Sequence, residues 1–129
     1  GCVLGNYPDA KRNPLGTITR EALQHGEIRT QTGAYVLTST AAARLLTAAV
    51  GDPAVRGQLY NTFDRWLDFA SLAPLLSDLL GRPVTVACEP APEPQPGVSN
   101  DRIATRAPQW DTDTQLRDLV TATIQQMTQ

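Results

Sequence analysis

Residues 35–51 of this 129-residue chain read YVLTSTAAARLLTAAVG, and this stretch decides the fold class. Tyr35–Thr38 is aromatic and β-branched, which favours a strand. Ala41–Val50 is apolar on nearly every side, which predicts a buried helix. Ser39 or Thr40 can cap that helix by accepting hydrogen bonds from its first free N–H groups. A strand that runs directly into a buried helix indicates a mixed domain with a sheet and helices packed together.

The residues before this stretch predict two strands and a helix. Cys2–Leu4 is apolar and is followed by a glycine, as at the end of a strand. Apolar residues recur at helical spacing over 17–25, and Gly26 supplies the left-handed residue that commonly ends a helix. Glu27–Thr30 and Tyr35–Thr38 flank a Thr-Gly pair, so they predict either a β-hairpin or two short strands joined by a tight turn.

The residues after it predict two more strands with a helix between them. Gln58–Phe63 alternates apolar and polar residues in the manner of a strand. Leu72–Leu80 carries leucines at positions i, i+3, i+4, i+7 and i+8, which form one broad apolar face of a helix. Asp68 or Ser71 can cap this helix. Pro83–Cys88 again alternates, as expected of a strand.

The C-terminal part combines a proline-rich segment with a helix. Four prolines in Glu89–Gly97 cannot continue a strand ladder, and they favour an extended linker over residues 89–98. Thr112–Gln115 forms a capping box before an amphipathic terminal helix. The whole pattern predicts one α+β domain over residues 1–129, a small mixed sheet with packed helices.

The composition argues against two classes of partner. The chain has 11 basic and 13 acidic residues, scattered, and a formal net charge of −2, which speaks against nucleic acid or an anionic membrane. No apolar stretch approaches the roughly 18 residues of a membrane span. Cys2 and Cys88 are far apart and form no C-x-x-C motif, so a disulfide framework is not expected. We expect a soluble, cytoplasmic protein.

The motifs of several chemistries are missing. There is no G-x-G-x-x-G turn and no P-loop, so no cofactor is expected to bind this chain alone. His25 is the only histidine and falls at a helix end, where it is expected to face solvent. The carboxylate pairs Asp64/Asp68 and Asp111/Asp113 are better explained by capping. We therefore predict no catalytic residue and no metal ligand.

Several polar and aromatic residues have the chemistry to hold a ligand. Arginine binds phosphate or carboxylate through two parallel hydrogen bonds, and an aromatic face suits a sugar or a base. The competing interpretation is that the arginines are solvated and the aromatic residues belong to the core. The candidates are Asn6, Tyr7, Lys11, Arg12, Arg29, Tyr60, Asn61, Arg65, Trp66 and Arg102.

Five passages, in order, resemble the C-terminal half of the extended short-chain dehydrogenase/reductases, the NAD-dependent epimerase/dehydratase family. Gly1–Pro8 resembles R-P-x-x-V-Y-G-P, and Tyr35–Ala42 is similar to F-V-H-V-D-D-V-A. Residues 57–61 resemble G-x-x-Y-N. Residues 67–83 are similar to the V-S-x-x-E-L helix that ends in G-R-P, and residues 99–110 to D-x-S-K … L-G-W. The resemblance covers nearly the whole chain.

The resemblance implies the substrate-binding domain of an enzyme that acts on nucleotide sugars. In that family the cofactor loop and the catalytic Ser, Tyr and Lys lie upstream of this region, so NAD or NADP is expected to bind the missing Rossmann half, and this chain alone is expected to be inactive. The loop of residues 6–14 and the segment 60–66 are expected to face the substrate. The substrate-binding residues so implied are Asn6, Tyr7, Arg29, Tyr60, Asn61, Arg65 and Arg102.

The sequence departs from the family's pattern at two places. Ser39 and Thr40 replace its Asp-Asp pair and can still cap the following helix. Gly33 stands where the epimerases carry an arginine that contacts the diphosphate, and Arg29 is the residue expected to substitute.

The alternative hypothesis is a free-standing ligand-binding or protein-interaction module of the same fold. A separated half exposes apolar surface, so a homodimer or a strand-exchanged assembly through Cys2–Leu4 is also expected.

Overall fold

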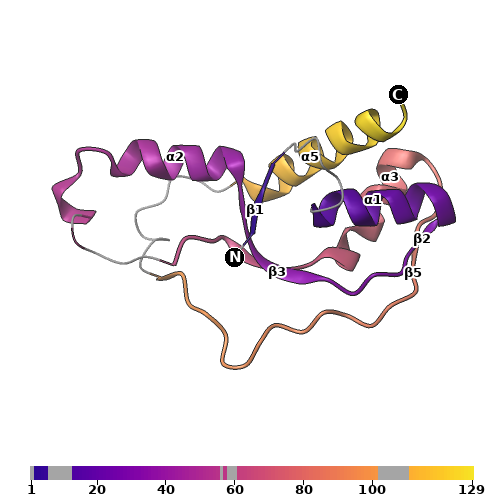
Figure 1. Cartoon of the computed structure of the whole chain (residues 1–129), viewed down its shortest axis with the longest axis horizontal. Coiled ribbons are helices and arrows are strands. Elements are labelled where there is room, and N and C mark those ends of the chain that lie inside the picture. The colour runs from indigo at the N-terminus through magenta and orange to yellow at the C-terminus, as the bar shows by residue number, and fades with distance from the viewer. Residues whose placement is uncertain (1, 6–12, 56, 58–60, 102–110) are drawn as a thin grey trace.

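The protein is a mixed α+β domain built around a three-stranded sheet and a two-stranded ladder (Figure 1). The structure is a computed structural model that describes residues 2–5, 13–55, 57, 61–101 and 111–129. The larger sheet has the order β1-β3-β4, with β1 at Cys2–Leu4, β3 at Gly33–Thr38 and β4 at Arg65–Asp68. β1 pairs with β3 in parallel, and β4 pairs with β3 antiparallel.

The segments expected to form a hairpin belong to different sheets. β2, Glu27–Ile28, pairs in parallel with β5, Thr85–Val86, whereas β3 pairs with β1 and β4. The hairpin alternative was therefore wrong. The segments are two short strands, as the other alternative predicted, but residues 29–32 form no tight turn and Gly33 is already part of β3. β5 is also shorter than the strand expected over residues 83–88.

Helix α1 spans Pro14–His25 and ends where expected, at Gly26 with φ 66°. It begins earlier than the apolar spacing predicts, because Asn13 caps it by accepting a hydrogen bond from the N–H of Leu15 at 3.1 Å. Proline at the first helical position suits this start, since proline has no N–H to leave unsatisfied. His25 is exposed in the last turn, as expected.

The cap expected from Asp68 acts on a 3-10 turn ahead of the leucine-rich helix and not on that helix, whose own cap position, Leu72, makes no side-chain cap hydrogen bond. Asp68 accepts a hydrogen bond from the N–H of Ala70 and starts the 3-10 turn η3, Phe69–Leu72, which leads into α3, Ala73–Leu80. The next residue, Gly81, has φ 67° and ends the helix. A second 3-10 turn, η2, lies at Pro53–Val55. Residues 61–63, at the end of the strand expected over 58–63, are not in a strand, and β4 begins only at Arg65.

The main core fills the space between one face of the sheet and helices α1, α3 and α5. Helix α5 spans Thr112–Met127. Burying each large side chain of this core contributes about 1.5–3 kcal/mol. The fully buried members include Leu4, Leu15, Ile18, Ile28, Val36, Phe69, Leu76 and Val120.

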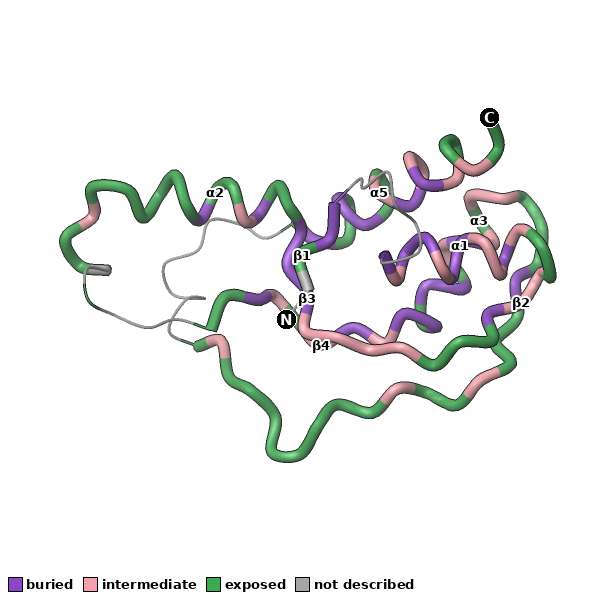
Figure 2. Tube along the Cα trace, viewed as in Figure 1, coloured by how far each residue is buried: buried purple, intermediate pink, exposed green. Residues whose placement is uncertain are grey.

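Helix α2, Ser39–Ala49, extends away from the other helices (Figure 1). The expectation that it is buried was wrong, because most of the helix is exposed (Figure 2). Along its length only Ala41 and Leu45 are buried, and they pack on Leu37. Leu46 is 70% exposed and the next apolar residue after the helix, Val50, is 83% exposed. The apolar sequence therefore leaves an uncovered surface.

Candidate binding site at the carboxyl edge of the sheet

The strands of the larger sheet bring several loops and helix ends to one edge. Leu4 lies opposite Thr38 in the parallel ladder, so β1 and β3 end together. Arg65 pairs with Val36, so the antiparallel strand β4 begins near the same edge. Ligands of open α/β sheets bind outside the carboxyl ends of parallel strands. We call this edge, with the residues that follow β1 and β3 and precede β4, the carboxyl edge.

Thr38 organises the carboxyl edge. Its hydroxyl accepts a hydrogen bond from the N–H of Ala41 at 3.1 Å and thereby caps α2. The same hydroxyl donates to the side-chain oxygen of Gln115 on α5, and both side chains are buried. The cap is thus Thr38, not Ser39 or Thr40, and their hydroxyls are free of that task. This bond joins the strand end, α2 and α5.

The capping box expected at the start of α5 is not formed. Asp111 takes the cap position but makes no side-chain cap hydrogen bond, and Thr112 is inside the helix. Gln115, which would reach back to the cap in a capping box, bonds to Thr38 instead. A tertiary contact has replaced the local one.

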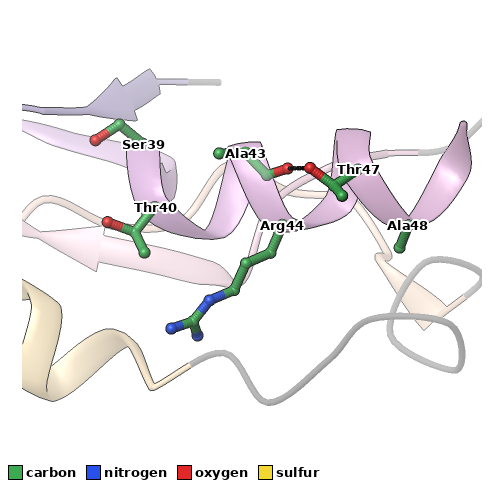
Figure 3. A pocket seen from close by; sticks show the side chains of 6 residues that line it. All are labelled: Ser39, Thr40, Ala43, Arg44, Thr47 and Ala48. Carbon is green, nitrogen blue, oxygen red and sulfur yellow. Dashed lines mark hydrogen bonds between the residues drawn. The ribbon is translucent and has the colours of Figure 1, made fainter.

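A hollow of about 750 Å³ runs along one side of α2. Figure 3 shows Thr40, Arg44 and Ala48 pointing to the same side of the helix. The hydroxyl of Thr47 donates to the carbonyl of Ala43 at 2.8 Å within the helix. The described residues that line the hollow are Ser39, Thr40, Ala43, Arg44, Thr47 and Ala48.

Among the described residues that line this hollow, Arg44 is the one cation. It is exposed, and within the described part of the chain it has no ion-pair or hydrogen-bond partner. The first turn of α2 carries no acidic residue, so the positive end of the helix dipole is not neutralised there. The hollow therefore combines a guanidinium, the hydroxyls of Ser39, Thr40 and Thr47, and a helix N-terminus, which are groups that favour an anion.

Arg65 is held by two carboxylates. Its Nε donates to Asp64 at 2.7 Å and its Nη1 to Asp113 of α5 at 2.9 Å. Burial alone lowers the pKa of Arg65, but the hydrogen bonds and charges of Asp64 and Asp113 outweigh it and raise the pKa. Two negative charges on one positive charge leave this group with a net negative charge. Arg65 thus ties β4 to α5 and is poorly suited to bind an anion.

Asn61 and Asn100 fasten the chain ahead of β4. The amide of Asn61 donates to the carbonyl of Ser99 at 3.0 Å. The amide of Asn100 donates to the carbonyls of Phe63, at 2.8 Å, and Asp64, at 3.0 Å. Of the residues predicted to bind substrate, Asn61 and Arg65 thus belong to the same segment, which leads into β4 at the carboxyl edge.

Arg29 does not join them. It precedes β3, at the opposite end of that strand from Arg65, and its Nε donates to Glu27 at 2.6 Å. The structure therefore places Arg29 away from the carboxyl edge. Asn6, Tyr7, Tyr60 and Arg102 lie outside the described residues, as do the further candidates Lys11 and Arg12.

Arg44 was missed by the sequence reasoning. The available signal was its position as the only charged residue of a helix that is otherwise apolar or hydroxylic. Thr40 lies one turn before Arg44, so the two polar side chains are on the same side of the helix, and this pairing indicates a polar site. What hid the signal was the expectation that the helix is buried.

A second, apolar hollow of about 210 Å³ lies beside the first strand. Val3 of β1 is 47% exposed and pairs with Leu37 of β3. The described lining residues are Val3, Leu37, Ala42, Leu45, Leu46 and Thr62, and none of them is charged. We call this the apolar groove.

The described residues contain neither a metal-binding cluster nor a glycine-rich turn for a cofactor. No group of three or more His, Cys, Asp or Glu side chains there has the arrangement to hold a metal ion. The described junctions from strand to helix, Thr38–Ser39 and Asp68–Phe69, contain no glycine that lets a pyrophosphate approach the backbone. No helix in the described ranges is long and apolar enough to cross a membrane.

Comparison with known proteins gives no relative from which a role transfers. No family model, no curated protein and no solved structure matches the chain.

Proposed function

We propose that this chain is the substrate-binding part of an NAD(P)-dependent nucleotide-sugar epimerase, dehydratase or related reductase, and that it acts together with a Rossmann half that holds the cofactor and the catalytic residues. The observation that carries the proposal is the parallel register of β1 and β3. It places Leu4 and Thr38, each of which lies within a passage that resembles the family, opposite each other at one sheet edge.

The polar groups at the carboxyl edge suit part of such a substrate. The diphosphate of a nucleotide sugar is anionic, and Arg44 with the hydroxyls of Ser39 and Thr40 offers it donors beside a helix N-terminus. Since Arg65 and Arg29 are each paired with carboxylates, Arg44 is the better candidate for this contact. This replaces the earlier expectation that Arg29 substitutes for the arginine absent at Gly33.

No step of hydride transfer is assigned to this chain. NAD or NADP supplies that chemistry when it is bound to the Rossmann half. The residues described here bind and orient the substrate, and Thr38 holds the strand end, α2 and α5 in fixed relative positions.

The uncovered surface supports a partner half. Parallel strands are normally covered on both faces. Here the parallel pair β1–β3 leaves Val3 exposed beside the apolar groove. An apolar layer of the Rossmann half is the cover that we propose.

The anion contact is tested by calorimetric titration of the full chain with UDP-, dTDP- and GDP-sugars in the absence of cofactor. We expect one of these to bind, and Arg44→Gln to weaken binding about 10- to 100-fold, the value of a lost charge-assisted hydrogen bond. Arg29→Gln is the matched control and should leave the affinity unchanged. Failure of all three ligands to bind, or equal losses from both substitutions, would contradict the assignment.

The second candidate is a protein-interaction module without enzymatic function. The apolar groove favours it, because its described lining residues are uncharged and such surfaces bind protein more readily than a charged small molecule. Binding of a nucleotide sugar that depends on Arg44 distinguishes the first candidate from the second.

A further inference from the structure

The proline-rich segment does more than connect two elements. Residues 89–100, which we call the strap, contain no strand and no helix, yet they run along the sheet in an extended path (Figure 1). Tyr35 of β3 and Trp66 of β4 are directly paired, so their side chains lie on the same sheet face. Their neighbours Val36 and Leu67 point to the main core on the other face. The strap therefore contacts the face that α1 and α5 do not cover.

Side-chain donors bind backbone carbonyls of the strap at its beginning. The amide of Gln31 donates to the carbonyl of Pro90 at 2.9 Å. The indole Nε1–H of Trp66 donates to the carbonyl of Ala91 at 3.1 Å. The donors come from two different segments of the chain and meet consecutive carbonyls.

At the end of the strap, one side chain accepts a hydrogen bond from the strap and another donates one to it. The N–H of Val98 donates to the hydroxyl oxygen of Tyr35 at 2.9 Å, and Asn61 donates to the carbonyl of Ser99. The strap is thus held at both ends by side chains of the sheet and of the loops that flank it.

Aromatic rings form the floor between these ends. The rings of Tyr35 and Trp66 pack edge to face with centroids 5.1 Å apart, and Tyr35 also packs on Phe63 at 4.6 Å. Gly33 permits this arrangement: a Cβ there would overlap the Trp66 ring and lie 2.9 Å from the Cβ of Ala91. The lack of a side chain at Gly33 lets the ring and the strap approach.

We propose that Gln31, Tyr35, Asn61, Phe63 and Trp66 form a recognition groove for an extended proline-rich peptide, and that the chain fills this groove with its own strap. Proline has no N–H, so alternating prolines present mainly carbonyls as backbone hydrogen-bonding groups. Aromatic floors with side-chain donors are the means by which proteins recognise such preformed, low-entropy segments. A simple spacer requires none of these contacts.

The strap is covalently part of the chain, so it competes with any peptide that is added to test the groove. A tethered ligand competes at an effective concentration of roughly millimolar, so an added peptide binds the natural chain only at comparable concentrations. The test protein is therefore the full chain with residues 89–98 replaced by a Gly-Ser repeat of equal length. The probe is a synthetic peptide of residues 89–100, EPAPEPQPGVSN, and its control has each proline replaced by serine.

We expect the peptide to shift the indole N–H resonance of Trp66 in the Gly-Ser variant and to saturate it, with the proline-free peptide at least tenfold weaker. The natural chain should show no shift at the same peptide concentration. Absence of binding to the folded variant, or equal affinity of the two peptides, would overturn the proposal.

A single substitution in the chain that keeps its own strap covers the case in which the Gly-Ser variant does not fold. Trp66→Phe keeps an aromatic floor and removes only the donor to Ala91. If the groove holds the strap as a unit, hydrogen exchange of the Val98 amide, at the other end, accelerates about two- to tenfold, as expected for one lost hydrogen bond. Unchanged exchange at Val98 would show that the strap is not bound as a unit, and the proposal would fail.

Discussion

At the scale of single residues, partners decide what a charged side chain can do. Arg29, Arg44 and Arg65 have the same guanidinium, but two of them are bound to carboxylates within hydrogen-bond distance. Arg44 is left as the residue that can attract an anion without first giving up a partner. The sequence places an acidic residue close to Arg29 and to Arg65, but it does not show that the side chains pair, nor that Asp113, 48 residues away, also binds Arg65.

Glu21 shows how one carboxylate joins two elements. It lies on α1 and accepts hydrogen bonds from the backbone N–H groups of Arg29 and Thr30 and from the hydroxyl of Thr30. Burial alone raises its pKa, but the Thr30 and Arg29 hydrogen bonds, with the charge of Arg29, outweigh burial and hold the pKa below its ordinary value of 4.5. In the unfolded chain the pKa returns to that ordinary value.

The stability that Glu21 contributes should therefore depend on pH. Because the folded state holds the lower pKa, the contribution is complete above pH 4.5 and is lost as the pH falls through the folded pKa. We expect Glu21→Gln to reduce the free energy of unfolding by about 0.5–1 kcal/mol at pH 7, since this half-exposed group is screened by solvent. The difference should shrink at pH 3. Urea unfolding at both pH values measures it, and an equal loss at both would contradict the role of the charge.

At the scale of elements, local signals predicted helix ends better than strand partners. Gly26 and Gly81 end α1 and α3 as expected, because a left-handed residue acts on its own turn. β2 was predicted as a strand, but its partner β5 lies more than 50 residues further along the chain, and nothing in the adjacent Thr-Gly pair indicates this. Long-range pairing overrode a local turn signal.

The candidate site was predicted in part for the same reason. Asn61 and Arg65 come to the carboxyl edge because they lead into β4, and the resemblance had placed this segment at the substrate. Arg29 does not, because β2 leaves the larger sheet to pair with β5. The apolar composition of α2 predicted that other residues pack over this helix. It did not show whether residues of this chain or of a partner do so.

The Thr38 cap links two helices to the sheet and should therefore be costly to remove. Thr38→Val keeps the shape of the side chain but removes both the cap to Ala41 and the donor to Gln115. We expect a loss of about 2 kcal/mol in the free energy of unfolding, from one helix cap and one buried hydrogen bond. Chemical denaturation measures the loss. Ser39→Ala and Thr40→Ala are the controls and should each cost less than about 0.5 kcal/mol. A larger loss at either control would return the cap to the position first expected.

At the scale of the whole molecule, the fold has a covered and an uncovered part. Helices α1, α3 and α5 enclose the main core, and the strap covers the aromatic residues on the opposite sheet face. Most of α2 is exposed (Figure 2), and Val3 of β1, Leu46 and Val50 are the large apolar residues that remain uncovered there. A cover for this part is what the proposed Rossmann half supplies, and without it the same surface is available to a second copy.

The free chain should therefore self-associate through α2. Leu46 and Val50 are the most exposed large apolar residues described, so replacing both with lysine introduces repulsion without disturbing the core. We expect Leu46→Lys with Val50→Lys to lower the average mass in multi-angle light scattering toward that of the monomer and to change the free energy of unfolding by less than about 0.5 kcal/mol per site. Gln125→Lys with Gln126→Lys adds the same charge to an exposed part of α5 and should leave the association unchanged. If the lysine pair on α5 lowers the mass as much as the pair at Leu46 and Val50, net charge and not the apolar surface controls the association. A natural chain that stays monomeric at high concentration would show that exposed α2 does not drive assembly.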